Sequence, residues 1–363
     1  MTDGASAARE PKALLVTGGA GFIGSAFIRY LLGPAGFAGT LVNLDLLTYA
    51  GNLENVASVA ADPRYRFVRG DIRDGELVAR LVTEHAIDAI AHFAAESHVD
   101  RSIAAPDAFI ETNIVGTFRL LEVARRFPGL HFHHVSTDEV FGSLGATGAF
   151  REDSPYHPNS PYSAAKAAAD HLVRAYAHTY GLSVTLSNSS NNYGPYQLPE
   201  KLVPLMLANL LAGAPLPVYG DGLHVRDWLF VDDHAEALWR IVRRGRAGET
   251  YNVGGAEERR NLELVGLLIE RVAVATGKSR EALERLVTFV PDRPGHDRRY
   301  SIDCEKLRRE LGWAPRHTLA TGLDATVRFY LERPDWVASA LKAAASADRR
   351  ASHAPPSRDP RRP

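Results

Sequence analysis

A glycine-rich segment, Thr17 to Gly24, constrains the fold of this chain more than any other feature. It follows a short apolar run at residues 13–16, which we predict to be a strand, and precedes residues 22–32, which we predict to be a helix. Glycines in such a turn let the backbone approach a pyrophosphate closely, and the helix N-terminus offers unpaired N–H groups. A tight turn without a ligand is the alternative, but the strand-to-helix setting favours a dinucleotide site.

Short apolar runs and amphipathic stretches alternate beyond this turn, as a parallel sheet covered by helices requires. We predict further strands at residues 41–44, 65–68, 87–93, 132–135 and 183–186, and helices at residues 77–84, 114–127 and 163–180. The predicted class is α/β: a Rossmann-type doubly wound parallel sheet with a smaller C-terminal substrate-binding lobe.

The composition of the sequence changes after Tyr193, where prolines become frequent around one clear predicted helix at residues 202–212. We therefore expect residues 12–190 to form an NAD-binding Rossmann domain and residues 191–340 to form mainly the substrate-binding lobe. A short apolar run at residues 249–253 is expected to return to the first sheet, so that the chain comes back near residues 225–255. Residues 1–11 and 341–363 carry few apolar anchors, and we expect both to be disordered.

Charge and cysteine content narrow the class of function. The chain has 42 basic and 43 acidic residues, which gives no electrostatic case for binding nucleic acid or a membrane. No run approaches the ~20 apolar residues of a membrane span, and the start lacks a basic region followed by an apolar core, so we expect a cytoplasmic protein. Cys304 is the only cysteine, which excludes an intrachain disulfide, and we expect no metal site.

Acidic and small residues at predicted strand ends suit a dinucleotide. Asp45 lies 21 residues beyond Gly24, where its carboxylate can accept both ribose hydroxyls and would repel a 2′-phosphate, so we expect NAD rather than NADP. Asp71, at the end of the third strand, can accept from the adenine amine. Ala94 and Ala95 end the fourth strand and leave room for the dinucleotide, although ordinary helix–strand packing explains them equally well.

A tyrosine and a lysine four residues apart, Tyr162 and Lys166, share one face of a predicted helix. A nearby ammonium stabilises tyrosinate, so that the tyrosine can act as a base near neutral pH. Thr137, at the end of the fifth strand, would hydrogen-bond the same substrate hydroxyl. Asp138 and Glu139 follow it, and hydride transfer alone would not need both acids. These residues therefore predict an oxidation coupled to an elimination.

With these motifs the chain resembles the extended short-chain dehydrogenase/reductase superfamily, and within it most closely the dTDP-glucose 4,6-dehydratases. The resemblance covers roughly residues 12–335. Its matching segments are TGGAGFIG at 17–24, LDLLTYAGN at 44–52, GDI at 70–72, FAAESHVDRSI at 93–103, STDEVFG at 136–142, SPYSAAKAAADHLV at 160–173, NNYGPYQLPEKLVP at 191–204, VYGDGLHVRDWLFV at 218–231, YNVGG at 251–255 and RPGHDRRY at 293–300.

The resemblance implies a hydro-lyase that converts dTDP-glucose to dTDP-4-keto-6-deoxyglucose and water. Tyr162 would take the proton of O4 while the C4 hydride passes to NAD, Glu139 would remove the C5 proton, and Asp138 would protonate the departing C6 hydroxyl. The hydride would return to C6, so that NAD stays tightly bound and is regenerated at each turnover. The resemblance also implies a homodimer.

The motifs and the resemblance together assign three sets of site residues. The catalytic set is Thr137, Asp138, Glu139, Tyr162 and Lys166. The cofactor set is Gly18, Gly21, Phe22, Ile23, Gly24, Asp45, Thr48, Asp71, Ile72, Phe93, Ala94, Ala95, Ser97, Thr112, Tyr162, Lys166 and Asn192. The substrate set is Ser97, Thr137, Asn191, Lys201, Leu202, Pro217, Tyr219, Arg226, Asn261, Asp292, Arg293, His296 and Tyr300. Within it, Arg226 can grip a diphosphate and Tyr219 can stack on a pyrimidine, whereas His296 could instead be structural.

Other functions stay open at this point. A UDP-hexose 4,6-dehydratase, a 4-epimerase and a UDP-glucuronate decarboxylase are related alternatives, and a non-catalytic cofactor-sensing protein is a more distant one. An epimerase does not need Asp138 and Glu139, and a decarboxylase would have to recognise a C6 carboxylate. Gln197-Leu198 and Leu46 depart from the His-Phe and Lys that the family often has. The choice between dTDP and UDP stays open.

Overall fold

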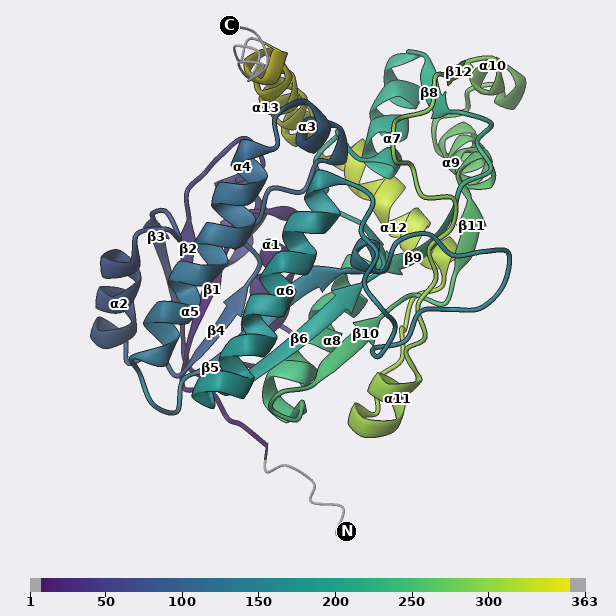
Figure 1. The fold of residues 1–363 in the computed structure, drawn as a ribbon. Coiled ribbons are helices and arrows are strands. Elements are labelled where there is room, and N and C mark those ends of the chain that lie inside the picture. The colour runs from purple at the N-terminus through teal and green to yellow at the C-terminus, as the bar shows by residue number, and fades with distance from the viewer. Residues whose placement is uncertain (1–7, 353–363) are drawn as a thin grey trace, which may run out of the picture.

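A seven-stranded parallel sheet forms the centre of the molecule (Figure 1) in the computed structural model, which describes residues 8–352. Its strand order is β10-β6-β5-β4-β1-β2-β3, and every neighbouring pair is parallel. The strands are β1 (Ala13–Thr17), β2 (Thr40–Asp45), β3 (Tyr65–Arg69), β4 (Ala89–His92), β5 (His131–Thr137), β6 (Val184–Ser189) and β10 (Thr250–Val253). The predicted α/β class is confirmed.

Helices cover both faces of the sheet. Helices α2, α5 and α6 lie on the face turned to the viewer in Figure 1, and α1 and α8 lie behind it. Their bounds are α1 (Phe22–Leu32), α2 (Gly75–Glu84), α5 (Thr117–Arg125), α6 (Pro161–Tyr180) and α8 (Val231–Arg244). Because both faces are covered, β1 and β5 are buried along their whole length. This burial explains the largely apolar sequence of β1, ALLVT.

Local signals in the sequence set the ends of α6, the helix that carries Tyr162 and Lys166. The Ser160 side chain accepts from the Ser163 amide in a capping box, and Pro161 occupies the first helical position. Gly181 ends the helix in the left-handed conformation. The helix therefore begins two residues before the predicted start at Ser163.

The helix predicted at residues 114–127 is irregular. Short helices α3 (Val99–Ala104) and α4 (Asp107–Phe109) lead into a π-helical segment, η2 (Ile110–Gly116), before α5 begins. Within η2 the Asn113 side chain accepts from the Glu96 amide at 2.8 Å and donates to the Glu96 carbonyl at 3.0 Å. The π segment thereby fixes the loop that follows β4, as such segments often do near functional sites.

A second core, built mainly from residues beyond 190, forms the C-terminal lobe. It buries large side chains such as Trp228, Phe230 and Trp336 between helices and two small sheets, β11-β9-β7 and β12-β8. The elements of the lobe are β7 (Asn191–Tyr193), α7 (Leu202–Ala212), β8 (Leu216–Tyr219), β9 (Val225–Phe230), β11 (Glu258–Arg260), α9 (Asn261–Thr276), α10 (Arg280–Glu284), β12 (Val287–Val290), α12 (Leu319–Glu332) and α13 (Pro334–Ser352). Helix α11 (Glu305–Leu311) instead packs with α8 and β10 beside the central sheet. Between β9 and β11 the chain returns to the central sheet through α8 and β10, which pairs with β6.

Both chain ends differ from the expected disorder within the described residues. The Arg9 amide donates to the Arg243 carbonyl at 2.7 Å and its Nε to the Val242 carbonyl at 2.8 Å, because the last carbonyls of α8 lack helical partners. Residues 341–352 continue helix α13, whose first turns bury Trp336, Val337 and Ala340 against the lobe. Residues 1–7 and 353–363 lie outside the described residues. Among the described helices, none combines the length and the apolar character needed to cross a bilayer.

Strand β5 carries three buried histidines, His131, His133 and His134, inside the sheet. The His131 ring nitrogens lie 2.9 Å from the Ser183 hydroxyl and 3.0 Å from the Thr185 hydroxyl. Burial is the main cause that lowers the pKa of His131 to about 3 and that of His134 to about 4. These imidazoles are therefore neutral in the folded protein.

Acidification is expected to destabilise the fold through these groups. An unfolded histidine titrates near pH 6.5, so the unfolded state binds more protons than the folded state as pH falls from about 6.5 toward 3. The contribution of neutral His131 to the free energy of unfolding is therefore complete above about pH 6.5. Between about pH 6.5 and 3 this contribution declines by up to about 1.4 kcal/mol for each unit of pH. Urea unfolding at pH 7.5 and 5.5 should show that the free energy of unfolding falls less between these pH values for His131→Gln than for the wild type. The exposed His178→Gln should match the wild type; an unchanged pH dependence in His131→Gln would refute this account.

Candidate active site

A cavity of about 1090 Å³ opens at the carboxyl ends of the central strands, between the sheet and the C-terminal lobe. Strand β1 has β2 on one side and β4 on the other, so the strand order reverses there, and ligands of such sheets bind at this point. Of the predicted site residues, all line the cavity except Asp292 and Tyr300.

The glycine turn packs tightly against the residues that follow β4 and against itself. Gly18 has φ +71°, and a Cβ on it would lie 2.6 Å from the backbone nitrogen of Ala94 at the end of β4. A Cβ on Gly24 would lie 2.3 Å from the Gly18 carbonyl oxygen. Gly21 is the N-cap of α1 and supplies no side-chain hydrogen bond, so the first amides of this 11-residue helix face the cavity without a side-chain cap.

Asp45 is held at the edge of the same cavity. Its two carboxylate oxygens accept from the Ala20 amide at 2.9 Å and the Leu47 amide at 2.8 Å. Each oxygen keeps a further lone pair for a ribose hydroxyl. The following residue, Leu46, brings no positive charge toward a 2′-phosphate. The glycine turn, the uncapped helix and Asp45 therefore fit NAD.

The predicted adenine contact, Asp71, has another partner. Arg73 Nη2 lies 2.7 Å from an Asp71 oxygen, and Arg73 Nε contacts both oxygens. Both Asp71 and Ile72 still line the cavity. Arg73 therefore orients the carboxylate that would meet the adenine.

Tyr162 and Lys166 lie together on the buried face of α6. Lys166 Nζ donates to the Val135 carbonyl at 2.8 Å, and burial lowers the Lys166 pKa to about 8 against the opposing effect of Asp170. Burial is also the main cause that raises the Tyr162 pKa, with contributions from the charges of Glu139 and Asp138. A hydrogen bond with Thr137 acts in the opposite direction on the Tyr162 pKa. The hydroxyl is therefore a base only when a nearby cation stabilises its anion.

Asp138 and Glu139 begin the 3₁₀ segment η3 (Asp138–Phe141) directly after β5. Burial raises the pKa of Asp138 well above its usual range, with further contributions from Glu139 and Asp227, and Asp138 Oδ2 has no hydrogen-bond partner. Burial also raises the Glu139 pKa, but here Arg293, Lys201 and Arg226 oppose the rise. Neighbouring carboxyls in such different surroundings can divide into an acid, Asp138, and a base, Glu139.

Sequence reasoning missed a buried network beneath Lys166. Asp170 is fully buried and accepts from the Ser136 and Tyr156 hydroxyls, both at 2.9 Å. His134 Nε2 lies 3.2 Å from Asp170 Oδ1 and 3.4 Å from Lys166 Nζ. The i, i+4 spacing of Lys166 and Asp170 on one helix was the available signal.

Helix α13 supplies a wall of the cavity that was also missed. Trp336 lines the cavity, and its indole Nε1 donates to Asn55 Oδ1 at 2.9 Å. Asn55 in turn donates to the Ala20 carbonyl at 2.9 Å. A segment near the C-terminus is thereby joined to the glycine turn.

Two predicted substrate residues lie behind the cavity and support residues that line it. Arg226 donates to the Asp297 and Val225 carbonyls, and its guanidinium lies 4.4 Å from the centre of the Tyr300 ring. Tyr300 therefore holds Arg226 instead of lining the cavity. Asp292 similarly contacts His296, which does line it.

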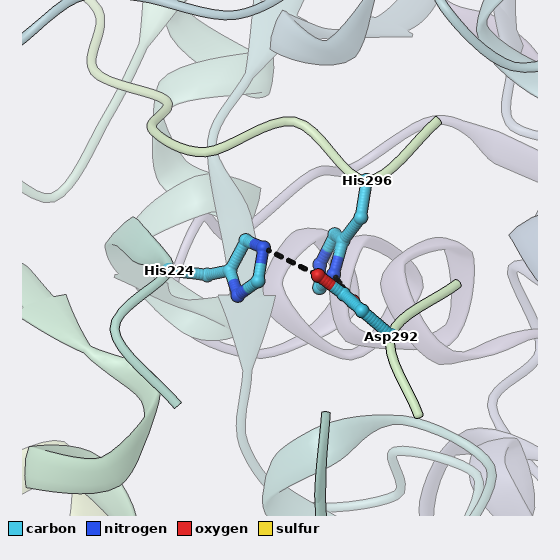
Figure 2. Close-up of side chains that lie close together, drawn as sticks. All are labelled: His224, Asp292 and His296. Carbon is cyan, nitrogen blue, oxygen red and sulfur yellow. Dashed lines mark hydrogen bonds and ion pairs between the residues drawn. The ribbon is translucent and has the colours of Figure 1, made fainter. Parts of the chain in front are cut away.

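One group in the described part of the chain has the composition of a metal site: His224, Asp292 and His296, whose ligand atoms lie within 4.8 Å of one another (Figure 2). The two imidazole rings are stacked, with centres 3.7 Å apart and planes 16° apart. An ion bound by two histidines lies near the plane of each ring, and planes that are nearly parallel and offset do not meet between the rings. In this arrangement the group does not suit one shared ion.

Comparison with known proteins places this geometry in context. Residues 15–326 match the family described as GDP-mannose 4,6 dehydratase. The dTDP-glucose 4,6-dehydratase of Xanthomonas campestris pv. campestris (strain B100) is 56% identical over 340 residues, which are 90% of this chain and 95% of that protein. A structure of the Streptomyces venezuelae dTDP-glucose 4,6-dehydratase with NAD bound has 51% identity and a TM-score of 0.83, covering 89% of this chain and 98% of that one. The UDP-glucose 4-epimerase of Thermotoga maritima has 29% identity and a TM-score of 0.78, covering 89% and 99%.

Gly18→Ala is expected to remove bound dinucleotide, because the new methyl group would collide with the backbone of Phe93 and Ala94, directly after β4. Gly36→Ala is a matched control: Gly36 has a similar φ of +61°, but nothing lies within 4 Å of its Cβ position. Alanine at positive φ should therefore lower the free energy of unfolding of both variants by a similar amount, roughly 1 kcal/mol. Measurement of dinucleotide released from the purified protein should show depletion only in Gly18→Ala. Equal contents in the two variants would contradict the assignment.

Proposed function

The chain belongs to the GDP-mannose 4,6-dehydratase family, and on this basis we propose that it converts dTDP-glucose to dTDP-4-keto-6-deoxyglucose and water. One observation carries the proposal: two acids, the buried Asp138 and the half-buried Glu139, line the same cavity as the Tyr162 and Lys166 pair. Relatives of about half identity named dTDP-glucose 4,6-dehydratase support dTDP as the nucleotide.

Oxidation at C4 begins the proposed reaction. Tyr162 Oη takes the proton of the O4 hydroxyl, while Thr137 hydrogen-bonds the same oxygen and the Lys166 charge stabilises the tyrosinate. NAD held in the cavity would supply the acceptor for the C4 hydride and the donor of the same hydride to C6. The residues that would hold it are those of the glycine turn together with Asp45.

Elimination follows because a C4 ketone acidifies the C5 hydrogen. Glu139, whose ionised form three cationic side chains favour, removes the C5 proton. Asp138, whose protonated form burial favours, gives its proton to the C6 hydroxyl, and water leaves. Glu139 then returns its proton to C5 as C6 is reduced. The proton that Tyr162 gained balances the one that Asp138 lost, so the net change is loss of one water.

An epimerase is the alternative that the fold also accommodates, as the structural likeness to a UDP-glucose 4-epimerase illustrates. Epimerisation at C4 needs no acid that releases a C6 hydroxyl and no base at C5. The presence of both Asp138 and Glu139 in the cavity therefore favours dehydration.

We also propose that the protein is a cytoplasmic homodimer. Ala164 lies on α6 and Ile110 begins the neighbouring segment η2, and both are exposed. These exposed apolar side chains support contact between two copies of the chain through this helical face. Burial raises the pKa of Cys304, so its thiol stays protonated and is compatible with a reducing compartment.

Purified protein incubated with dTDP-glucose is expected to form a 4-keto sugar, detected by its absorbance in alkali, without consuming added NADH. Because each hydride taken from C4 returns to C6, no external reductant is required. Parallel reactions with UDP-glucose and GDP-mannose should be slower. Absence of product from every nucleotide hexose tested would reject the dehydratase proposal, and faster turnover of UDP-glucose would reject the proposed nucleotide.

Glu139→Gln should block both exchange of the C5 hydrogen with solvent and water loss, while substrate-dependent NADH formation persists. The amide keeps the shape of the side chain but cannot accept a proton, so kcat should fall by roughly 10²- to 10⁴-fold. Asp138→Asn is the matched comparison, because it should slow water loss while C5 exchange continues. Deuterium incorporation followed by mass spectrometry separates the two steps. Full dehydration by Glu139→Gln would show that another residue is the base.

A further inference from the structure

His296 faces the cavity with one ring nitrogen already committed. Its Nδ1 lies 2.6 Å from Asp292 Oδ1 (Figure 2), and the ring lines the cavity although its side chain is only 6% exposed. The carboxylate can only accept, so Nδ1 donates to it. Nε2 is therefore the ring atom left for a ligand.

His224 supports this arrangement from behind. Its Nε2 lies 3.2 Å from the other oxygen of Asp292, its ring is stacked on the His296 ring, and its side chain is 3% exposed (Figure 2). The His224 carbonyl accepts from the Asn261 amide at 2.9 Å, which anchors the residue directly before β9. His224 does not line the cavity, so its effect on a ligand has to pass through Asp292 and His296.

The charges around His296 favour an anion in front of it. Burial, Arg293 and Arg226 lower the His296 pKa to about 4 against the effect of Asp292, so the ring is neutral near pH 7. With Nδ1 protonated, a neutral ring presents a bare lone pair at Nε2, and this would repel a phosphate oxygen. An anion close to the ring would favour the imidazolium instead. Titratable or charged groups from several elements surround the ring. Its own loop supplies Asp292 and Arg293, and the start of β9 supplies Arg226, with His224 just before that strand. The others are Tyr219 of β8, Asp100 of α3, and Asp221 and Arg298 of adjoining loops.

We propose, resting on the proposed function, that His296 takes up one proton at Nε2 when the nucleotide diphosphate binds and donates it to a phosphate oxygen. Asp292 and His224 are positioning residues for this imidazolium. The proton comes from solvent and returns to solvent when the product leaves, so the reaction stays balanced. Arg226 and Arg293, which line the same cavity, supply the other positive charges that a diphosphate requires.

Proton uptake can be measured by titration calorimetry in buffers of different ionisation enthalpy at pH 7. The probe is the phenyl ester of thymidine diphosphate, which carries the diphosphate but has no sugar hydroxyl to be oxidised and no ionisation near neutral pH. The holoenzyme should take up close to one proton per site, and His296→Gln should take up none. His178→Gln, at an exposed position on α6, should behave as the wild type. Absence of uptake by the wild type, or unchanged uptake in His296→Gln, overturns the proposal.

The role of His224 is tested by a split between KM and kcat. His224→Ala should raise the KM for dTDP-glucose by roughly tenfold, the equivalent of one lost hydrogen bond, with kcat changed less than twofold. His224→Gln, whose amide can still donate toward Asp292, should restore most of the KM. Equal effects on KM and kcat, or no rescue by Gln, would show that His224 is merely structural.

The outcomes keep the inference separate from the proposed function. Turnover of dTDP-glucose without proton uptake on binding overturns the inference alone. Proton uptake with the phenyl ester but no turnover of any nucleotide hexose supports the diphosphate role of His296 and rejects the dehydratase.

Discussion

The contact between the glycine turn and the end of β4 is the constraint on which the rest of the site depends. Gly18 lies so close to Ala94 that a single methyl group would separate the two strand ends. This approach sets where the first turn of α1 stands relative to the loop that follows β4. Because Asp45 accepts from the Ala20 amide within the same turn, the position of the carboxylate predicted to bind the ribose follows from the same packing.

Burial then determines the chemistry of the catalytic groups. Removal from water raises the pKa of Tyr162 and Asp138 and lowers that of Lys166, and all three shifts disfavour charge. At Glu139 this effect of burial is opposed, because cationic side chains from the C-terminal lobe lower the pKa of its carboxyl. In the proposed reaction, the lobe therefore favours Glu139 over Asp138 as the base, because its cations stabilise the Glu139 carboxylate.

Local patterns in the sequence were sufficient for much of the fold and for most of the cavity lining. The helices at residues 22–32 and 202–212 have the predicted bounds, because glycine and proline signals at their ends are local. The π segment η2 has no such signal, since Asn113 is held by a tertiary contact with Glu96. The support roles of Asp292 and Tyr300 likewise depend on partners, His224 and Arg226, that lie about 70 residues away in the chain. A motif shows that such residues belong to the site but does not show which side of the cavity wall they occupy.

Elements that are far apart in the chain line one side of the cavity, and this arrangement suits a cofactor that undergoes no net change. Trp336 of α13 is joined to the glycine turn through Asn55, so helix α13 and the first strand–helix turn form one wall. An enzyme that must exchange its cofactor at each turnover benefits from an open site, whereas one that returns its hydride within the same turnover does not. Since elimination between oxidation and reduction leaves NAD in its starting state, a site walled by both chain ends costs the proposed reaction nothing in cofactor exchange. Asp138 and Tyr162 are themselves buried, and this burial gives their proposed proton transfers low-dielectric surroundings, where a charge interacts more strongly with its neighbours than in water.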